Sequence, residues 1–561
     1  MRPTETVYLS LGSAANAASM HFWNAQQAYF EFHRDAPPPL VEHDVSFRAG
    51  QGTDGLETYV PRALLFDVRS EFGAMARINA LYAGEDEEEA PVCETIRTAE
   101  HVEPSEWAPS EGPCARRMGR PRYWSDYASV LFHPRSQVHV AAPGLYGSSF
   151  LATPEAGTGS PAPASFADGV RVAHAMESEQ RVMEEQVRWL AEDCDLMQGF
   201  QVAASSSDVF SGVSATYLSY LADEYPKTER HATLLSRTMP ASYARVAGMN
   251  EVLALTQAVE HAHLVVPVHL SGACESRPVI QPAWDDMHQA AAVVATLWET
   301  ATLTTRLRQR TDTMASLRGR LAWRGDTPLV QLGGCLPTPL LAPVATTSEV
   351  DTLIDTLLAA KGYATSAPKP LFDARAALAS AWWDCSLSYG GGTGAAPVAV
   401  PYAECLVARD GQPQAEGPTM RALAEWQAGQ PPWMTRTFVP RAYPTERPYP
   451  DFFYGLTSDG RVLPEADTSV RASVSSVPCV ASLRSSPDTL ALVERARCWV
   501  VDVLEDFVPL ATYGLEGGMD RDAVLDLRET LERLCDAYGT ERSEDAEPGT
   551  DEEWVDEAWD L

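Results

Sequence analysis

The sequence lacks the cysteine and histidine patterns that metal sites and disulfide frameworks need. Its ten cysteines are scattered over 561 residues, with no C-x-x-C pair and no clustered histidines. Zinc and a disulfide framework are therefore weakly supported. Reduced, buried thiols in an intracellular protein are the expected state.

Long apolar runs are also missing. No run approaches the 18 residues of a membrane-spanning helix, so no transmembrane segment is expected. The first twenty residues carry Arg2 as their only basic residue and read as the approach to a strand. This start differs from an Arg-rich presequence, so we expect a cytoplasmic protein or one at an organelle's outer surface.

Basic residues are scarce. Lys and Arg number 43 against 77 Asp and Glu, for a net charge of −34. A strongly acidic protein is not attracted to nucleic acid or to an anionic membrane, so neither is expected as the main partner. With 45% hydrophobic and 21% charged residues, the chain can still form a sizeable core.

The N-terminal stretch predicts strand, turn and helix. An apolar, β-branched run from Glu5 to Leu11 stops at Gly12, and an Ala-rich segment then continues to Trp23. A strand of this kind fits a parallel sheet. Farther on, the run from Leu196 to Ala204 is the next strong strand candidate.

The turn after this second strand carries the main functional argument. A glycine-rich turn between strand and helix lets backbone N–H groups approach phosphate oxygens. Here the turn, Ser207 to Val213, holds a single glycine, and Val209 and Phe210 would obstruct that approach. Asp208 puts a carboxylate where a phosphate would sit, and it is also a good helix N-cap. A structural turn is therefore favoured over a phosphate site.

The flanks of this turn resemble tubulin. The chain is similar to the tubulin pattern C-L-Q-G-F-Q before the turn and E-E-Y-P after it, whereas the turn itself departs from G-G-G-T-G-S-G. Gly12 and Asn16 match G-Q-C-G-N, in which the Asn contacts guanine, but Ser13 and Ala14 cannot replace the phosphate-side Gln and Cys. The resemblance implies an α/β, tubulin-like fold with a Rossmann-like parallel sheet.

Two more tubulin-like matches bear on the nucleotide. The stretch from Tyr59 resembles Y-V-P-R-A-I-L-V-D-L-E and keeps Asp67, but Arg69 stands where the cation-side glutamate would be. Asn250 falls where tubulins read P-Y-N and would meet guanine. The resemblance thus leaves Gly12, Asn16, Asp67 and Asn250 as a vestigial guanine-nucleotide site, with no catalytic residue and no metal site; GTP is a doubtful cofactor.

Three further patterns point to a narrower family, and the last two of them are not found in tubulin. They are D-V-x-F-R-x-G from Asp44, W-S-D-Y from Trp124 and H-P-R-S from His133. These resemble the Misato family of tubulin-like proteins, whose fungal members govern mitochondrial distribution. The resemblance implies a role in mitochondrial inheritance and morphology.

The expected domain organisation follows. Residues 1–315 form the tubulin-like domain, with an acidic, Pro-rich insertion at 84–118; 316–480 form an α+β intermediate-type domain; 481–540 form C-terminal helices; and 541–561 form an acidic disordered tail. Periodicity predicts helices at 177–192, 490–513 and 521–538. The run at 390–394 spells the missing glycine loop, but a flexible loop is the favoured interpretation.

Three hypotheses for function stay open. The first is a non-catalytic protein that acts by contact in mitochondrial partitioning, DNA inheritance and morphology, at the mitochondrial outer surface and in the cytoplasm. The second is a divergent GTPase that assembles or switches on nucleotide. The third is a factor for tubulin or spindle assembly, with tubulin or the cytosolic chaperonin as partner.

Overall fold

The computed structural model describes residues 4–31, 38–51, 57–73, 75, 121, 123–140, 165–270, 279–309, 312–324, 327–339, 378, 381–386, 400–427, 433–462, 471–505 and 521–539. The predicted insertion at 84–118, the glycine run at 390–394 and the acidic tail lie outside these residues. Those three predictions therefore stay predictions.

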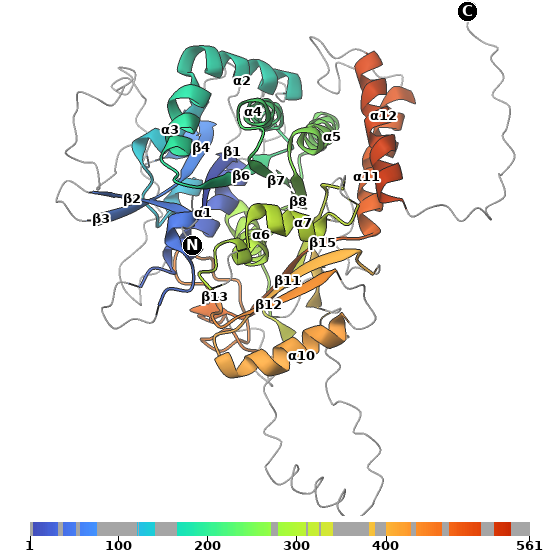
Figure 1. Ribbon diagram of the computed structural model, residues 1–561. Helices are drawn as coiled ribbons and strands as arrows, with labels where there is room; N and C mark the ends of the chain where they lie inside the picture. Colours follow the sequence, from blue (N-terminus) through green and yellow to red (C-terminus); the bar gives the residue numbers. More distant parts are fainter. Residues whose placement is uncertain are drawn as a thin grey trace, which may run out of the picture.

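A six-stranded parallel sheet forms the first half of the fold (Figure 1). Its strands are β1 (Glu5–Leu11), β4 (Ala63–Val68), β5 (Gln137–Val140), β6 (Met197–Ser205), β7 (Glu229–Ser236) and β8 (Leu264–His269). The spatial order is β5-β4-β1-β6-β7-β8, and every neighbouring pair is parallel. From β1 the chain adds β4 and then β5 on one side of the sheet, and it adds β6, β7 and β8 on the other side. The order therefore reverses between β1 and β6, which is where open α/β sheets bind ligands.

Helices cover both faces of this sheet (Figure 1). On one face lie α1 (Ser13–Gln27) and α6 (Met287–Thr302); on the other lie α2 (Phe166–Gln180), α3 (Arg188–Glu192), α4 (Phe210–Glu224) and α5 (Ala244–His261). Alternate strand residues enter opposite cores: Val7 and Leu9 pack with α2–α5, and Tyr8 packs with α1 and α6. The predicted doubly covered parallel sheet is confirmed.

The single helix predicted at 177–192 is wrong in its continuity. Helix α2 ends at Gln180, Arg181 takes a left-handed φ of 50°, and a wider π-type turn at Met183–Val187 leads into α3. Met183, Val187 and Leu190 are all buried nonetheless. Their spacing is satisfied on both sides of the break, so apolar periodicity alone could not reveal it.

A second, mixed sheet follows. Its strands are β9 (Gln331–Cys335), β10 (Trp383–Asp384), β11 (Ala403–Arg409), β12 (Met434–Val439) and β15 (Cys479–Ser485), in the order β10-β9-β15-β11-β12. Helix α6 packs on one face, next to α7 (Met314–Leu321), and α10 (Glu416–Trp426) packs on the other (Figure 1). Strand β15 ends five residues past the boundary suggested at 480.

Smaller elements connect these layers. The hairpin β2 (Phe47–Gln51) and β3 (Glu57–Pro61) leads into β4, and β13 (Tyr443–Pro444) pairs with β14 (Ser476–Val477). Short 3₁₀ turns lie at His43–Val45, Arg69–Phe72, Trp124–Tyr127, Pro134–Ser136, Leu303–Thr305 and Pro413–Ala415.

The C-terminal helices α11 (Asp488–Glu505) and α12 (Arg521–Tyr538) pack against α5 (Figure 1). The Tyr538 hydroxyl bonds both backbone groups of Leu329, at 2.7 Å from its N and 3.1 Å from its O. Arg324 donates to the carbonyls of Ala537 and Gly539. These contacts tie the end of α12 to the chain entering the second sheet. The helix predicted at 521–538 is confirmed, and the one predicted at 490–513 is confirmed as far as Glu505, because residues 506–513 lie outside the described residues.

Candidate functional site

The candidate site lies where β1, β4 and β6 end. Gly12 follows β1, Asp67 is near the end of β4, and the turn Ser206–Val209 joins β6 to α4. Parallel pairing brings these three ends to one edge of the sheet, at the reversal in strand order. Tertiary structure thus brings Gly12 and Asp67 to the same edge of the sheet as the turn after β6.

Asp67 is the centre of a closed hydrogen-bond network. Its side chain is fully buried and accepts from Ser13 Oγ at 3.1 Å, Asn16 Nδ2 at 3.0 Å and Trp124 Nε1 at 2.9 Å. The backbone N–H of Val68 adds a bond of 2.8 Å. Trp124, the first residue of W-S-D-Y, is itself fully buried. The Asp67 carboxyl group is therefore occupied by the protein's own donors.

All four donors to Asp67 are neutral. Burial raises the pKa of Asp67 from 3.8 to about 7, and the hydrogen bonds from Asn16, Val68, Trp124 and Ser13 offset part of this rise. Arg69 is exposed, and its charge contributes to lowering the pKa of His139. Within the described residues, no group of three His, Cys, Asp or Glu side chains could hold a metal ion.

The backbone donors at the start of α1 are also engaged. The N–H groups of Ala14 and Ala15 point at Ser205 Oγ, at 3.2 and 3.4 Å. Gly12 has a φ of 91°, and a Cβ atom there would lie 2.7 Å from the Phe210 ring and from Ser205 Oγ. Phe210 therefore packs directly over the glycine at which a phosphate would approach the backbone.

The turn between β6 and α4 is held by internal bonds. Asp208 Oδ1 accepts from the N–H of Phe210 at 3.0 Å, so Asp208 stabilises the start of α4, as its type predicts. Ser207 Oγ donates to Glu251 Oε1 at 2.7 Å and accepts from the N–H of Arg237. Val209 and Phe210 are buried. The turn has the structure of a capped helix start.

Asn250 has a different setting from Asn16. It is buried on α5, its Oδ1 accepts from the N–H of Phe166 at 2.7 Å, and its Nδ2 donates to the carbonyl of Ser207 at 3.4 Å. It thereby joins the start of α2 to the turn before α4. The predicted contact of Asn250 with guanine stays a prediction. Both described hydrogen bonds of the Asn250 side-chain amide are to backbone groups of the protein.

Helix α2 closes the space in front of α4. A Cβ atom on Gly169 would lie 2.1 Å from the Val209 carbonyl oxygen, and one on Gly212 would lie 2.0 Å from that of Phe166. The two helices are therefore in backbone contact at these glycines. The residues do not fit a nucleotide phosphate chain, because Phe210, Ser205 and α2 occupy its position.

Among the described residues, Ser206 Oγ and one side-chain atom of Asn16 are buried in the site without a hydrogen-bond partner. Asn16 Oδ1 is buried and accepts no hydrogen bond in the described part of the chain. The sequence identifies Gly12, Asn16, Asp67 and Asn250, but it does not show that Trp124 contacts Asp67, that Ser205 contacts the start of α1, or that Phe166 contacts Asn250. The tryptophan in the polar motif W-S-D-Y is the available signal in the sequence, but no local pattern places it against Asp67.

Two family models match the sequence. The Misato Segment II tubulin-like domain matches residues 4–111, and the Tubulin domain matches residues 116–307. Together they cover more than half of the chain. The two matches adjoin each other and include every strand of the parallel sheet.

Curated proteins from fungi and from a primate are similar to this chain. Protein DML1 of Gibberella zeae is 31% identical over 345 residues, which is 58% of this chain and 66% of the relative. Protein dml-1 of Neurospora crassa is 31% identical over 350 residues, 59% of this chain and 62% of the relative. Protein misato homolog 1 of Pongo pygmaeus is 26% identical over 388 residues, which is 60% of this chain and 65% of the relative. The aligned region spans slightly less than two thirds of each relative's length.

Proposed function

This chain belongs to the Misato family of tubulin-like proteins, and on that premise we propose that it is a non-catalytic protein acting by contact in mitochondrial partitioning, mitochondrial DNA inheritance, distribution and morphology. The observation that supports a role without catalysis is the filled phosphate position: Phe210 packs on Gly12, and Ser205 takes the first N–H groups of α1. A tubulin-like fold in this state presents surfaces to partners and does not need a nucleotide.

The proposed location is the mitochondrial outer surface and the cytoplasm. No helix among the described residues is long and apolar enough to cross a bilayer. The net charge of −34 disfavours direct binding to anionic lipid, so a protein partner is the proposed attachment. Tubulin and the cytosolic chaperonin are candidate partners.

Calorimetry tests the nucleotide question. GTP with Mg²⁺ is titrated into the purified full chain, into an Asn16→Ala variant and into a Phe210→Ala variant. We expect no heat of binding from the first two, because the phosphate position is filled. Micromolar binding by the wild type that the Asn16→Ala change abolishes would overturn the proposal. Unchanged melting temperatures would show that the variants are folded.

Complementation in a fungal cell tests the biological role. Cells depleted of their own homologue receive the wild type or the Asn16→Ala variant, and mitochondrial distribution and DNA inheritance are scored. We expect both chains to restore them equally. Protease treatment of isolated mitochondria should digest the associated protein. Protection from protease would contradict the outer-surface location.

One observation favours the second candidate, a divergent guanine-nucleotide-binding protein. Within the part of the chain that the structure describes, Asn16 Oδ1 is a buried acceptor without a partner, and a guanine N–H group is a donor that would satisfy it. For guanine to reach Asn16 Oδ1, the side chain of Phe210 or Trp124 would have to move. Binding that appears only in Phe210→Ala would show that this side chain alone blocks the site.

A further inference from the structure

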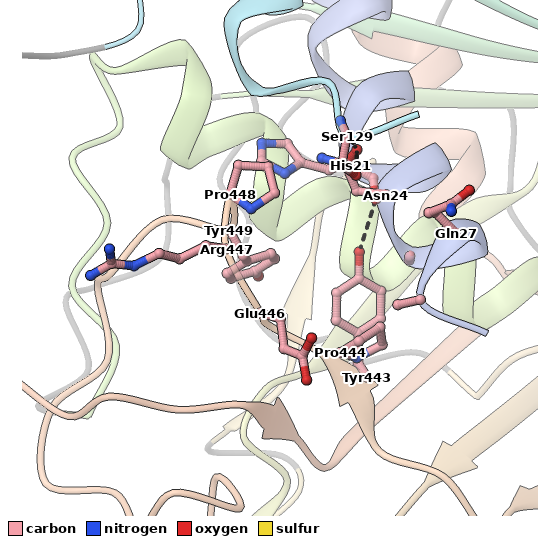
Figure 2. Close-up of a pocket in the computed structure, with 12 residues that line it drawn as sticks. His21, Asn24, Gln27, Ser129, Tyr443, Pro444, Glu446, Arg447, Pro448 and Tyr449 are labelled. Atoms are coloured by element: carbon pink, nitrogen blue, oxygen red, sulfur yellow. Dashed lines mark hydrogen bonds between the residues drawn. The ribbon is translucent and has the colours of Figure 1, made fainter. Parts of the chain in front are cut away.

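A cavity lies at the end of α1 opposite to the filled phosphate position. The helix begins at the filled phosphate position with Ser13, and its last two turns line a cavity of about 150 Å³. Across the cavity lies the segment from Tyr443 to Tyr449, which crosses from the second sheet (Figure 2). Ser129, just after the W-S-D-Y motif, completes the wall. The cavity therefore sits at the junction of the two sheet layers.

The walls of this cavity are aromatic. Tyr443, Tyr449 and His21 line it together with Pro444 and Pro448. The His21 ring stacks on Tyr127 at 4.8 Å between centroids and meets Tyr449 edge to face at 5.7 Å. Rings prefer stacked or edge-to-face neighbours at such distances, so these walls suit another aromatic ring.

Hydrogen bonds hold the walls in place. The Tyr443 hydroxyl donates to the His21 carbonyl at 3.4 Å, and the Tyr449 hydroxyl lies 2.9 Å from Thr296 Oγ1 (Figure 2 draws the first of these). Asn24 donates to the Tyr127 carbonyl and accepts from Ser129. The protein's own hydrogen bonds thus fix the cavity walls, which lowers the entropic cost of binding a ligand.

The mouth of the cavity offers acceptors. Within the described residues, neither the Gln27 amide nor the Glu446 carboxylate has a hydrogen bond or ion pair to protein. Glu446, Arg447 and Ser129 are exposed, so the mouth opens to solvent. Figure 2 shows the Arg447 side chain extending away from Tyr443 and Gln27. A donor carried by the ligand would meet Glu446 or the Gln27 carbonyl.

We propose that this cavity binds a single aromatic group that carries a hydrogen-bond donor, of the indole or phenol class. A cavity of about 150 Å³ holds one benzene ring, so the size selects one ring system of this order. The Glu446 carboxylate and the side-chain carbonyl of Gln27, which have no hydrogen bond to other described residues, select a ligand that carries a donor. The group is either a free small molecule or a Trp or Tyr side chain of a peptide.

Ligand-observed NMR tests the proposal with three probes: indole, 1-methylindole and cyclohexanol. Indole should bind the full-length wild type with a Kd of about 1 mM or tighter. Loss of the donor in 1-methylindole should weaken binding about three- to ten-fold. Cyclohexanol has a hydrogen-bond donor but no aromatic π system, so it should not compete with indole for the cavity. Equal binding of cyclohexanol and indole, or no binding of indole, would overturn the proposal.

Two variants locate the binding. Ala28→Phe should fill the cavity and abolish indole binding. Gln27→Ala/Glu446→Ala changes only the mouth and should remove the preference of indole over 1-methylindole. The matched control is Glu179→Ala, an exposed carboxylate on α2, which should bind like the wild type. A preference that survives the double change, or binding that survives Ala28→Phe in a folded protein, would place indole elsewhere and overturn the proposal.

Competition by a peptide distinguishes a Trp or Tyr side chain from a free small molecule as the natural ligand. A synthetic peptide of residues 550–561 carries Trp554 and Trp559, and its partner has both replaced by alanine. Competition with indole by the first peptide alone would support a polypeptide side chain as the natural occupant. Indole binding that neither peptide affects would support a free small molecule.

Discussion

Asp67 is a buried carboxyl group with no cation among its hydrogen-bond partners in the described chain. Ser13, Asn16, Trp124 and the Val68 N–H all donate to it. Such a setting raises the pKa because the charged form loses solvation and gains only neutral donors. In place of a residue that assists cation binding, the chain has a core polar contact that joins α1, β4 and the W-S-D-Y turn.

The first prediction concerns stability and pH. The pKa of Asp67 rises from 3.8 to about 7 on folding, so the folded state binds this proton more tightly than the unfolded state. The stabilisation is fully present below about pH 4 and is lost as pH rises through 7, by up to about 4 kcal/mol. Relative to Asp67→Asn, wild-type stability should therefore fall between pH 5 and 8.

Urea unfolding of both proteins at four pH values measures this difference. Glu251 is buried beside Ser207, and its pKa is raised to about 7. The stability of the wild type relative to Glu251→Gln should therefore also fall as the pH rises. The large acidic excess affects wild type and variant equally, so it cancels. A stability difference that stays constant from pH 5 to 8 would contradict the prediction.

At the scale of elements, the contact between α2 and α4 closes the site. Gly169 and Gly212 let the two backbones meet, with their hypothetical Cβ atoms only 2.1 and 2.0 Å from carbonyl oxygens of the other segment. Asn250 adds bonds to both ends of this contact. Helix α4, which would flank a bound nucleotide, is instead covered by α2.

The second prediction is that alanine at this contact destabilises the fold. Gly169→Ala or Gly212→Ala forces the helices apart and should cost about 1–3 kcal/mol or more. The matched control is Gly319→Ala on α7, where a Cβ atom would meet nothing within 4 Å. That change should be neutral or stabilise by up to about 1 kcal/mol. Thermal unfolding compares the three; equal effects would show that the contact is loose.

At the scale of the molecule, a buried ion cluster joins helices α1 and α6 to the second sheet. Glu299 of α6 is fully buried and lies 2.6 Å from Arg409 of β11 and 3.3 Å from Arg306. Gln26 and Tyr29, in and just after α1, donate to the same carboxylate at 2.9 and 3.1 Å. One side chain therefore contacts both halves of the fold.

The third prediction is that Glu299→Gln separates the halves. Two arginines would then be buried without a counter-charge, which should cost about 3–5 kcal/mol. The control, Glu192→Gln, removes an exposed partner of Arg188 and should have no measurable effect. Limited proteolysis and thermal unfolding report the change. Wild-type stability of Glu299→Gln would show that solvent or Tyr29 compensates the arginines.

Much of the fold could be predicted locally. Strand β1, the turn at Gly12, the two C-terminal helices and the capping role of Asp208 follow from apolar spacing and turn chemistry, which act over a few residues. The break at Arg181 could not, because burial of Met183, Val187 and Leu190 is compatible with a continuous or an interrupted helix.

By itself, the sequence determined the α/β class, the family and the altered turn, since each is encoded in contiguous residues. Only the tertiary structure decided what fills the site. Trp124 reaches Asp67 across 57 residues of sequence, Ser205 reaches Ala14 across 191, and Asn250 reaches Phe166 across 84. Such contacts depend on the path of the whole chain, because parallel strands bring together ends that no local pattern relates.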